Sequence, residues 1–209
     1  MTNDGPLILF TPGEIELITD EKLFLAKARV TEKIRGLLED LHAGLRQELQ
    51  NIPLLAPPGF DHGRCQFVKG EHLEHFPYQY LDFPKHFAGG ETFTFRSLFW
   101  WGHHFVFALL LEGPALLRYK QNCLNRYRAV AGRDLALCLS PSLWEWKRGE
   151  GYTLPMTPDR KSEVAAVLSD RRSVKIARFV ALDDPIVREG RIVTAGREAF
   201  QAILPVITP

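Results

Sequence analysis

Cysteine is scarce in this sequence. The three cysteines, Cys65, Cys123 and Cys138, are an odd number at wide and irregular spacing. Such a pattern excludes a disulfide framework, and it contains no C-x-x-C motif for metal binding or redox chemistry. We therefore expect reduced thiols in a cytoplasmic protein.

Net charge and long apolar runs are lacking as well. Lysine and arginine number 26 against 25 acids, and a net charge of +1 gives no general attraction to nucleic acid or to an anionic membrane. The most apolar stretch, from Leu98 to Leu111, has 14 residues, whereas a bilayer requires roughly 20. The start, MTNDGPLILFTPG, has neither the basic leader nor the apolar length of a signal peptide. We expect no membrane partner and no nucleic-acid partner.

The common catalytic motifs are also missing. The sequence contains no P-loop, no G-x-G-x-x-G and no G-x-S-x-G, which removes the usual nucleotide-binding and hydrolase signatures. At 209 residues, with 45% hydrophobic and 24% charged residues, the chain is long enough to enclose a full core. We predict a single domain over residues 1–209.

The first strong pattern is helical. Apolar residues recur every three or four positions, which predicts one helix from a cap at Thr19 or Asp20 to about Gln50, with its apolar stripe on a core. The stripe consists of Leu23, Ala26, Val30, Ile34, Leu37, Leu41, Leu45 and Leu49. Pairing of two such helices in a dimer is a weaker alternative, because about four heptads without a sustained charge pattern specify pairing poorly.

A second pattern, of period two, occupies the middle of the chain. Large apolar residues alternate from Phe93 to Trp101 and again from His103 to Leu111. Such alternation predicts two adjacent strands that turn near Gly102, and the apolar loading of both parities indicates a sheet that is covered on both faces.

The remaining segments predict further helices and strands. A helix should begin at Gly113-Pro114 and end near Ala131, because proline fits the first turn of a helix. Strands are expected at 134–139, from Ser142 through a glycine turn and back, and at 174–182, and helices at 157–168 and 195–204. The fold class is therefore α+β, with a largely antiparallel central sheet packed against the long N-terminal helix and further helices.

In its order of elements the sequence resembles the YktB-like family of uncharacterised bacterial proteins. The best-matching residues are Phe99 to Gly113 and Phe179 to Pro185, with the -DDP- turn. Trp100, Trp101, His103 and His104 depart from the family pattern. The resemblance implies an α+β fold and brings no known activity with it.

Aromatic and basic residues suggest a ligand site. The run FPYQYLDFPKHF, residues 76–87, carries tyrosines that can line a cleft or pack against the sheet. The segment after Pro114 carries arginines and lysine without an acid, and arginine binds carboxylate and phosphate well. We predict an aromatic-lined cleft for a small anionic molecule, formed by Tyr78, Tyr80, Arg96, Trp101, His103, Arg118 and Arg126.

A metal-dependent enzyme is the alternative. Six of the seven histidines lie between His62 and His104, and neutral imidazoles are good ligands for zinc or iron. The candidate ligands are His72, His75 and His104, although a three-residue spacing suits a metal only in a helix or tight turn. Hydrogen-bonded or surface histidines remain the competing interpretation. Neither a cofactor nor an oligomeric state follows from these patterns.

Overall fold

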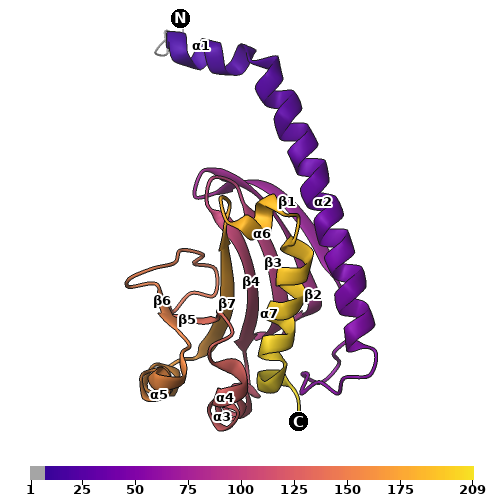
Figure 1. Ribbon diagram of the computed structural model, residues 1–209, viewed down its shortest axis with the longest axis vertical. Coiled ribbons are helices and arrows are strands. Elements are labelled where there is room, and N and C mark those ends of the chain that lie inside the picture. Colours follow the sequence, from indigo (N-terminus) through magenta and orange to yellow (C-terminus); the bar gives the residue numbers. More distant parts are fainter. Residues whose placement is uncertain (1–7) are drawn as a thin grey trace, which may run out of the picture. The chain divides into compact units, whose positions relative to one another are not determined.

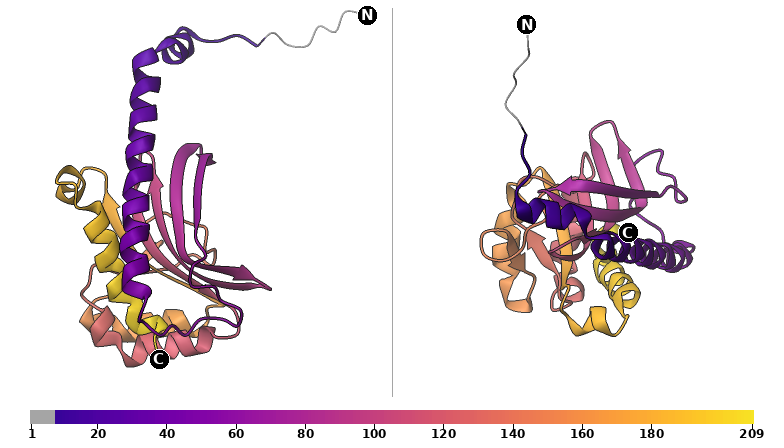
Figure 2. Two further views of the ribbon diagram at one scale, coloured as in Figure 1. Left: turned by 90° about the vertical axis from the view of Figure 1, so that its right-hand side faces the viewer. Right: turned by 90° about the horizontal axis from the view of Figure 1, so that it is seen from above.

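The computed structural model describes residues 8–209 (Figures 1 and 2). The chain divides into two compact units, Met1–Gly36 and Leu37–Pro209. The single domain expected from the sequence therefore stays a prediction, and each unit is described by itself. No helix within residues 8–209 is both long enough and apolar enough to span a bilayer.

The first unit consists of helix α1 (Pro12–Thr19) and the beginning of helix α2 (Glu21–Leu49). Thr11 caps α1 in a capping box: its hydroxyl accepts from the Glu14 N–H at 3.3 Å, and the Glu14 carboxylate accepts from the Thr11 N–H at 2.7 Å. Asp20 then begins α2 by accepting from the Leu23 N–H at 3.0 Å. The long helix and Asp20 as its cap are confirmed, whereas α1 was not predicted.

The second unit is built on one antiparallel sheet of seven strands in the order β1-β2-β3-β4-β7-β5-β6. The predicted hairpin is present as β3 and β4, which turn at Gly102 with φ +72°. The sheet is strongly curved (Figure 2). The strands are β1 (Gln66–Leu73), β2 (Phe76–Ala88), β3 (Glu91–Trp100), β4 (His104–Glu112), β5 (Ala136–Cys138), β6 (Thr153–Pro155) and β7 (Ser173–Ala181).

The order of helices and strands along the chain is close to the predicted order, and the α+β class is confirmed. The helix after Pro114 is interrupted at Arg126 and forms two pieces. The helices are α3 (Leu116–Asn125), α4 (Tyr127–Val130), the 3-10 turn η1 (Pro158–Arg160), α5 (Lys161–Ser169), α6 (Pro185–Arg188) and α7 (Ile192–Ile207).

One face of the sheet is covered by α7 and the C-terminal part of α2, which lie side by side (Figures 1 and 2). The Phe95 ring on β3 packs against Phe200 of α7 with centroids 5.1 Å apart. Gly196 lets the elements approach closely, since a Cβ there would lie 2.8 Å from Phe107 and 2.9 Å from Leu41. This face is an apolar core of the kind that the helical and period-two patterns predict.

The structure differs from the sequence-based expectation in two segments. The mixture of histidines, aromatics and prolines in residues 60–87 predicts short strands and ordered loops, whereas residues 66–88 form the long β1-β2 hairpin. Pro84 is tolerated there because it lies where the register of β2 against β3 shifts. The expected strand from Ser142 is wrong: residues 139–152 form a loop, the tryptophan loop, and only β6 follows it. Buried side chains, rather than a neighbouring strand, bind the carbonyls of Leu143, Glu145 and Trp146 in this loop.

Candidate functional site

The other face of the sheet carries charged residues beneath the tryptophan loop. Because side chains alternate along a strand, Arg96 of β3 shares this face with Leu98 and Trp100. Asp82 of β2 is paired directly with Arg96 in the strand register, and Tyr80 is paired with Leu98. Lys175 of β7 lies on the same face, two strands away. The register of the sheet thus gathers residues that are far apart in sequence.

Arg96 and Asp82 form a buried ion pair at the centre of this face. The Asp82 carboxylate accepts hydrogen bonds from Nε and Nη2 of Arg96, both at 2.7 Å. Their side chains are only 8% and 1% exposed. Bidentate pairing of this kind fixes the plane of the guanidinium. A guanidinium has five N–H donors, and Asp82 takes two of them, so donors remain for other groups.

Aromatic rings surround the Arg96 guanidinium. Its central carbon lies 3.7 Å from the centre of the Tyr80 ring and 5.0 Å and 5.6 Å from the Trp144 and Trp146 rings. These distances are within the range of cation–π attraction. Burial raises the pKa of Tyr80, and Arg96 opposes that shift. The phenol is therefore neutral at physiological pH.

The tryptophan loop is fastened over the sheet by two buried side chains. The Lys175 ammonium donates to the carbonyls of Leu143, at 3.0 Å, and of Glu145. It also lies 4.3 Å from the Trp146 ring centre, and burial lowers the pKa of Lys175. A ring nitrogen of His104 lies 3.0 Å from the Trp146 carbonyl. The carbonyls of Leu143, Glu145 and Trp146 are thereby held, and so are the positions of the two tryptophans.

A cavity of about 270 Å³ opens between β2, β3 and the tryptophan loop. Tyr78 and Tyr80 present parallel rings to it, with centroids 6.0 Å apart and planes 5° apart. Flat aromatic walls with one guanidinium suit stacking and hydrogen bonding to a ligand. The lining is Tyr78, Tyr80, Trp144 and Trp146, together with Leu73, Leu98 and Arg96.

The position of Tyr78 depends on a glycine of the neighbouring strand. Gly70 of β1 is paired with Tyr78, and a Cβ at Gly70 would lie 2.4 Å from the tyrosine ring. The ring therefore lies directly over the glycine backbone. Any larger residue at Gly70 would displace Tyr78 from the cavity wall.

The structure brings together Tyr78, Tyr80 and Arg96 of the predicted ligand residues, and it places the others elsewhere. Trp101 packs on Phe99 at 5.4 Å. His103, in the β3-β4 turn, stacks on Trp100 with ring centroids 3.6 Å apart. Neither lines the cavity.

The two predicted helix arginines are remote from this cavity. Arg118 is exposed on α3. Arg126 donates to the carbonyls of Pro205 and Thr208 at 3.1 Å each, and so holds the end of the chain after α7. Arg126 also lines a separate open depression with Arg128 and Lys161.

The predicted metal ligands are not gathered into one centre. His72 is exposed on β1, and His75 lies in the β1-β2 turn with φ +74°. His104 is buried, and burial is the main cause that lowers the pKa of His104 to about 4. Within residues 8–209, no three histidine, cysteine or acidic side chains are placed to hold a metal ion.

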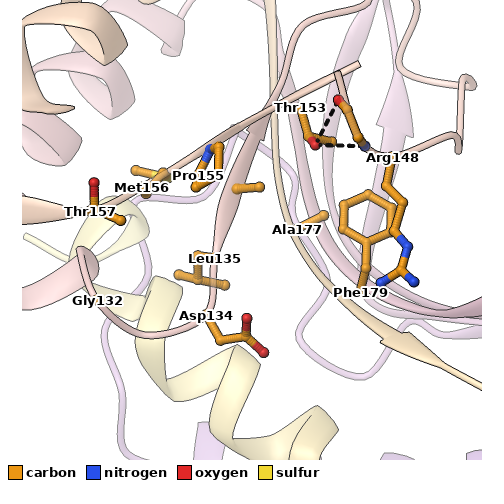
Figure 3. Close-up of a pocket in the computed structure, with 12 residues that line it drawn as sticks. Gly132, Asp134, Leu135, Arg148, Thr153, Pro155, Met156, Thr157, Ala177 and Phe179 are labelled. Carbon is orange, nitrogen blue, oxygen red and sulfur yellow. Dashed lines mark hydrogen bonds between the residues drawn. The ribbon is translucent and has the colours of Figure 1, made fainter. Parts of the chain in front are cut away.

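A second cavity, of about 490 Å³, lies near β5 and β6 (Figure 3). Arg148 extends beside the Phe179 ring, and Asp134 points into the opposite side. Thr153 is held by hydrogen bonds between its hydroxyl and the N–H and carbonyl of Gly149, at 3.1 and 3.3 Å. The Asp134 carboxylate is paired with Arg178 at 3.0 Å. This cavity lacks the facing aromatic walls of the first.

Sequence reasoning missed Asp82, Trp144, Trp146 and Lys175 as members of the site. The signal for the tryptophans was their spacing of two in SLWEWKR, which fits a strand as well as a loop. The partner of Arg96 lies 14 residues away, and no local pattern links the two. Comparison with protein-family models, with curated proteins and with solved structures finds no match for this chain. The YktB-like resemblance therefore stays a prediction.

Proposed function

We propose that this protein is a binding module that holds a small, planar, anionic molecule in the cavity under the tryptophan loop. The observation that carries the proposal is the Arg96 guanidinium, buried and oriented by Asp82 within an aromatic-lined cavity. A guanidinium whose N–H donors are fixed in one plane between aromatic rings suits a flat ligand that bears a carboxylate or a similar acceptor group.

The charge of the buried groups supports an anionic ligand. Among the described residues, the buried charged side chains of this face are Arg96, Lys175 and Asp82. The partly exposed Glu145 carboxylate also acts on Lys175, but the fully buried groups alone, two cations and one carboxylate, carry an excess of positive charge. An anion bound in the cavity beside Arg96 would offset that excess, because charge interactions are stronger where water is excluded.

The size of the cavity favours a small molecule. Its volume of about 270 Å³ is slightly below the roughly 300–1,000 Å³ typical of drug-sized sites. The nearly parallel Tyr78 and Tyr80 rings offer flat contact area on one side, and Trp144 offers it on another. A single aromatic ring with one anionic substituent matches these walls.

Benzoate is a suitable first probe, with benzamide as its neutral counterpart and benzylamine as its cationic one. Each is titrated into the full-length protein while the indole N–H signals are followed by NMR. We expect saturable shifts with benzoate, and binding of benzamide and benzylamine that is weaker by about tenfold or more, since a charged hydrogen bond contributes roughly 1.5–3 kcal/mol.

Two tryptophan variants provide a matched comparison. Trp144 lines the cavity and is 49% exposed, so Trp144→Ala should leave the fold intact and weaken benzoate binding by about tenfold or more. Trp101→Ala removes a tryptophan outside the cavity and should leave binding unchanged. Equal binding of the three probes, or greater loss in Trp101→Ala than in Trp144→Ala, would overturn the proposal.

Gly70 allows a test that substitutes none of the residues lining the cavity. Gly70→Val should displace the Tyr78 ring that lies over it, and thereby weaken benzoate binding. Gly63→Val serves as control, since Gly63 precedes β1 and a Cβ there would make only an ordinary contact, 3.4 Å from the Asp61 carboxylate. Unchanged binding in Gly70→Val would show that Tyr78 is not part of the binding wall.

A further inference from the structure

The N-terminal unit carries large apolar side chains that remain in water. Nine of them between Ile8 and Leu25 are at least 43% exposed, and Ile8 and Leu9 reach 87% and 79%. Residues 26–209 add only Phe76, Leu117, Trp144 and Tyr152 to this class. The exposed apolar surface of the described chain is therefore concentrated on α1, the residues before it and the first turns of α2.

The size of this surface is that of a protein interface. At roughly 100 Å² of exposed apolar area each, nine such side chains present about 900 Å². The largest apolar patch of a typical monomer is about 300–600 Å². A standard protein interface buries about 800 Å² on each partner. The apolar area exposed along residues 8–25 is thus comparable in sum with what one partner buries in a standard interface.

The charges along the same segment are divided by sign. Residues 12–21 contain four acids and no base, whereas residues 22–36 contain five bases and one acid. Two copies laid side by side in opposite directions would bring the acidic part of each against the basic part of the other. Parallel copies would instead oppose like charges.

We propose that this segment is the dimerisation surface of the protein, and that its partner is the same segment of a second copy in antiparallel orientation. A two-fold axis then uses the identical surface on both chains, as in most homodimers. The apolar side chains supply the association energy, and the divided charges set the direction. The inference is independent of the ligand proposed for the cavity.

A membrane surface fits the segment less well. Peripheral helices that bind anionic lipid carry an excess of lysine and arginine. Residues 12–36 hold five acids and five bases, so the segment has no net charge to attract such a surface. A uniform bilayer offers no counterpart to separate acidic and basic parts. A second copy of the segment in antiparallel orientation offers one for each part.

The first experiment measures the mass of the full-length protein in solution by sedimentation or light scattering. We expect about twice 23.8 kDa at micromolar concentration. Leu25→Glu, at a residue 59% exposed, should raise the dissociation constant at least about tenfold, because symmetry places two carboxylates in the interface. Leu117→Glu is the matched control, at a leucine 66% exposed on α3, and should leave the mass unchanged.

A charge exchange tests the orientation. Glu16→Lys with Glu21→Lys neutralises residues 12–21 and gives residues 12–36 a net charge of +4, whereas Arg29→Glu with Lys33→Glu neutralises residues 22–36 and gives a net charge of −4. Each variant alone should dissociate, and an equimolar mixture should recover the dimer. Added salt should weaken the wild-type dimer, whereas a parallel pair would be strengthened by salt.

Three results would overturn the inference. The first is a monomeric wild type at about 100 µM. The second is a dimer that Leu25→Glu leaves intact, which would place the interface elsewhere. The third is a wild-type monomer that sediments with phosphatidylcholine–phosphatidylserine vesicles and loses that binding in Leu25→Glu, which would identify a lipid surface in place of a second copy.

Discussion

The two faces of the central sheet are stabilised in different ways. Beneath α7 the face is apolar, with Phe95 and Phe107 packed against α7. Beneath the tryptophan loop the same strands bury Arg96 and Asp82. The first face depends on contact area, whereas the second combines an apolar cluster, which includes Leu98, Trp100 and Trp146, with paired buried charges. Truncating one buried side chain should therefore lower the free energy of unfolding by a different amount on each face.

The largest effect is expected from Asp82→Ala. This change leaves the buried Arg96 cation without its carboxylate and should cost about 3–5 kcal/mol of unfolding free energy. The double variant Asp82→Leu with Arg96→Met should recover much of that loss, because a packed apolar pair needs no partner. Urea unfolding measures both. A loss below about 1 kcal/mol in Asp82→Ala would show that water reaches the Arg96 guanidinium.

On the sheet face that α7 covers, Ile203→Ala should lower the free energy of unfolding by about 2–4 kcal/mol. The side chain is 1% exposed on α7, and its truncation leaves a cavity without any unpaired charge. The loss should therefore be independent of pH between about 5 and 8. A loss that varies strongly across this range would contradict the apolar character of this face.

His104 should make the polar face sensitive to acid. Burial lowers the pKa of His104 from 6.5 to about 4. The unfolded chain binds a proton below pH 6.5 and the folded chain only below about 4, so stability is full above 6.5 and falls between these values. The loss from this residue should reach about 2–3 kcal/mol at pH 4.5.

The control for this pH effect is His104→Gln, whose side-chain amide does not titrate. Its unfolding free energy should fall less than that of the wild type between pH 7 and pH 4.5. Arg148 and His103, which face His104 and also disfavour its charge, are kept in both proteins. Parallel curves for the two proteins would assign the acid sensitivity to other groups.

The smallest effect is expected from Gly196→Ala, at about 1–2 kcal/mol of destabilisation. The added methyl would lie 2.8 Å from Phe107 and 2.9 Å from Leu41, and this overpacking outweighs the gain in helix propensity. Gly36→Ala in α2 is the matched control, since nothing lies within 4 Å of its added Cβ. It should stabilise the helix by up to about 1 kcal/mol, and thermal unfolding distinguishes the two signs.

Much of the fold could be predicted because its elements have strong local patterns. The stripe of α2, and the alternation that produces β3 and β4, each arise from residues within one element. Residues 139–152 could not be predicted in this way. Their alternating tryptophans suit a strand, but the carbonyls are bound by Lys175 and His104 from other strands.

The candidate site was predicted only in part for the same reason. Tyr78 and Tyr80 were recognised from an aromatic run, whereas Trp144 lies more than 60 residues further along the chain. Trp101 was grouped with them through nearness in sequence, yet it lies outside the cavity in contact with Phe99. Residues that come together only across strands share no local sequence pattern, so such a site cannot be recognised from any one segment.

The sequence by itself determined the α+β class, the long helix and the hairpin, because the period of the apolar residues is a local property. Only the tertiary structure decided that Asp82 faces Arg96, that Lys175 fastens the tryptophan loop and that four aromatic rings meet around one cavity. These contacts depend on strand order and register, which are set by packing over the whole sheet.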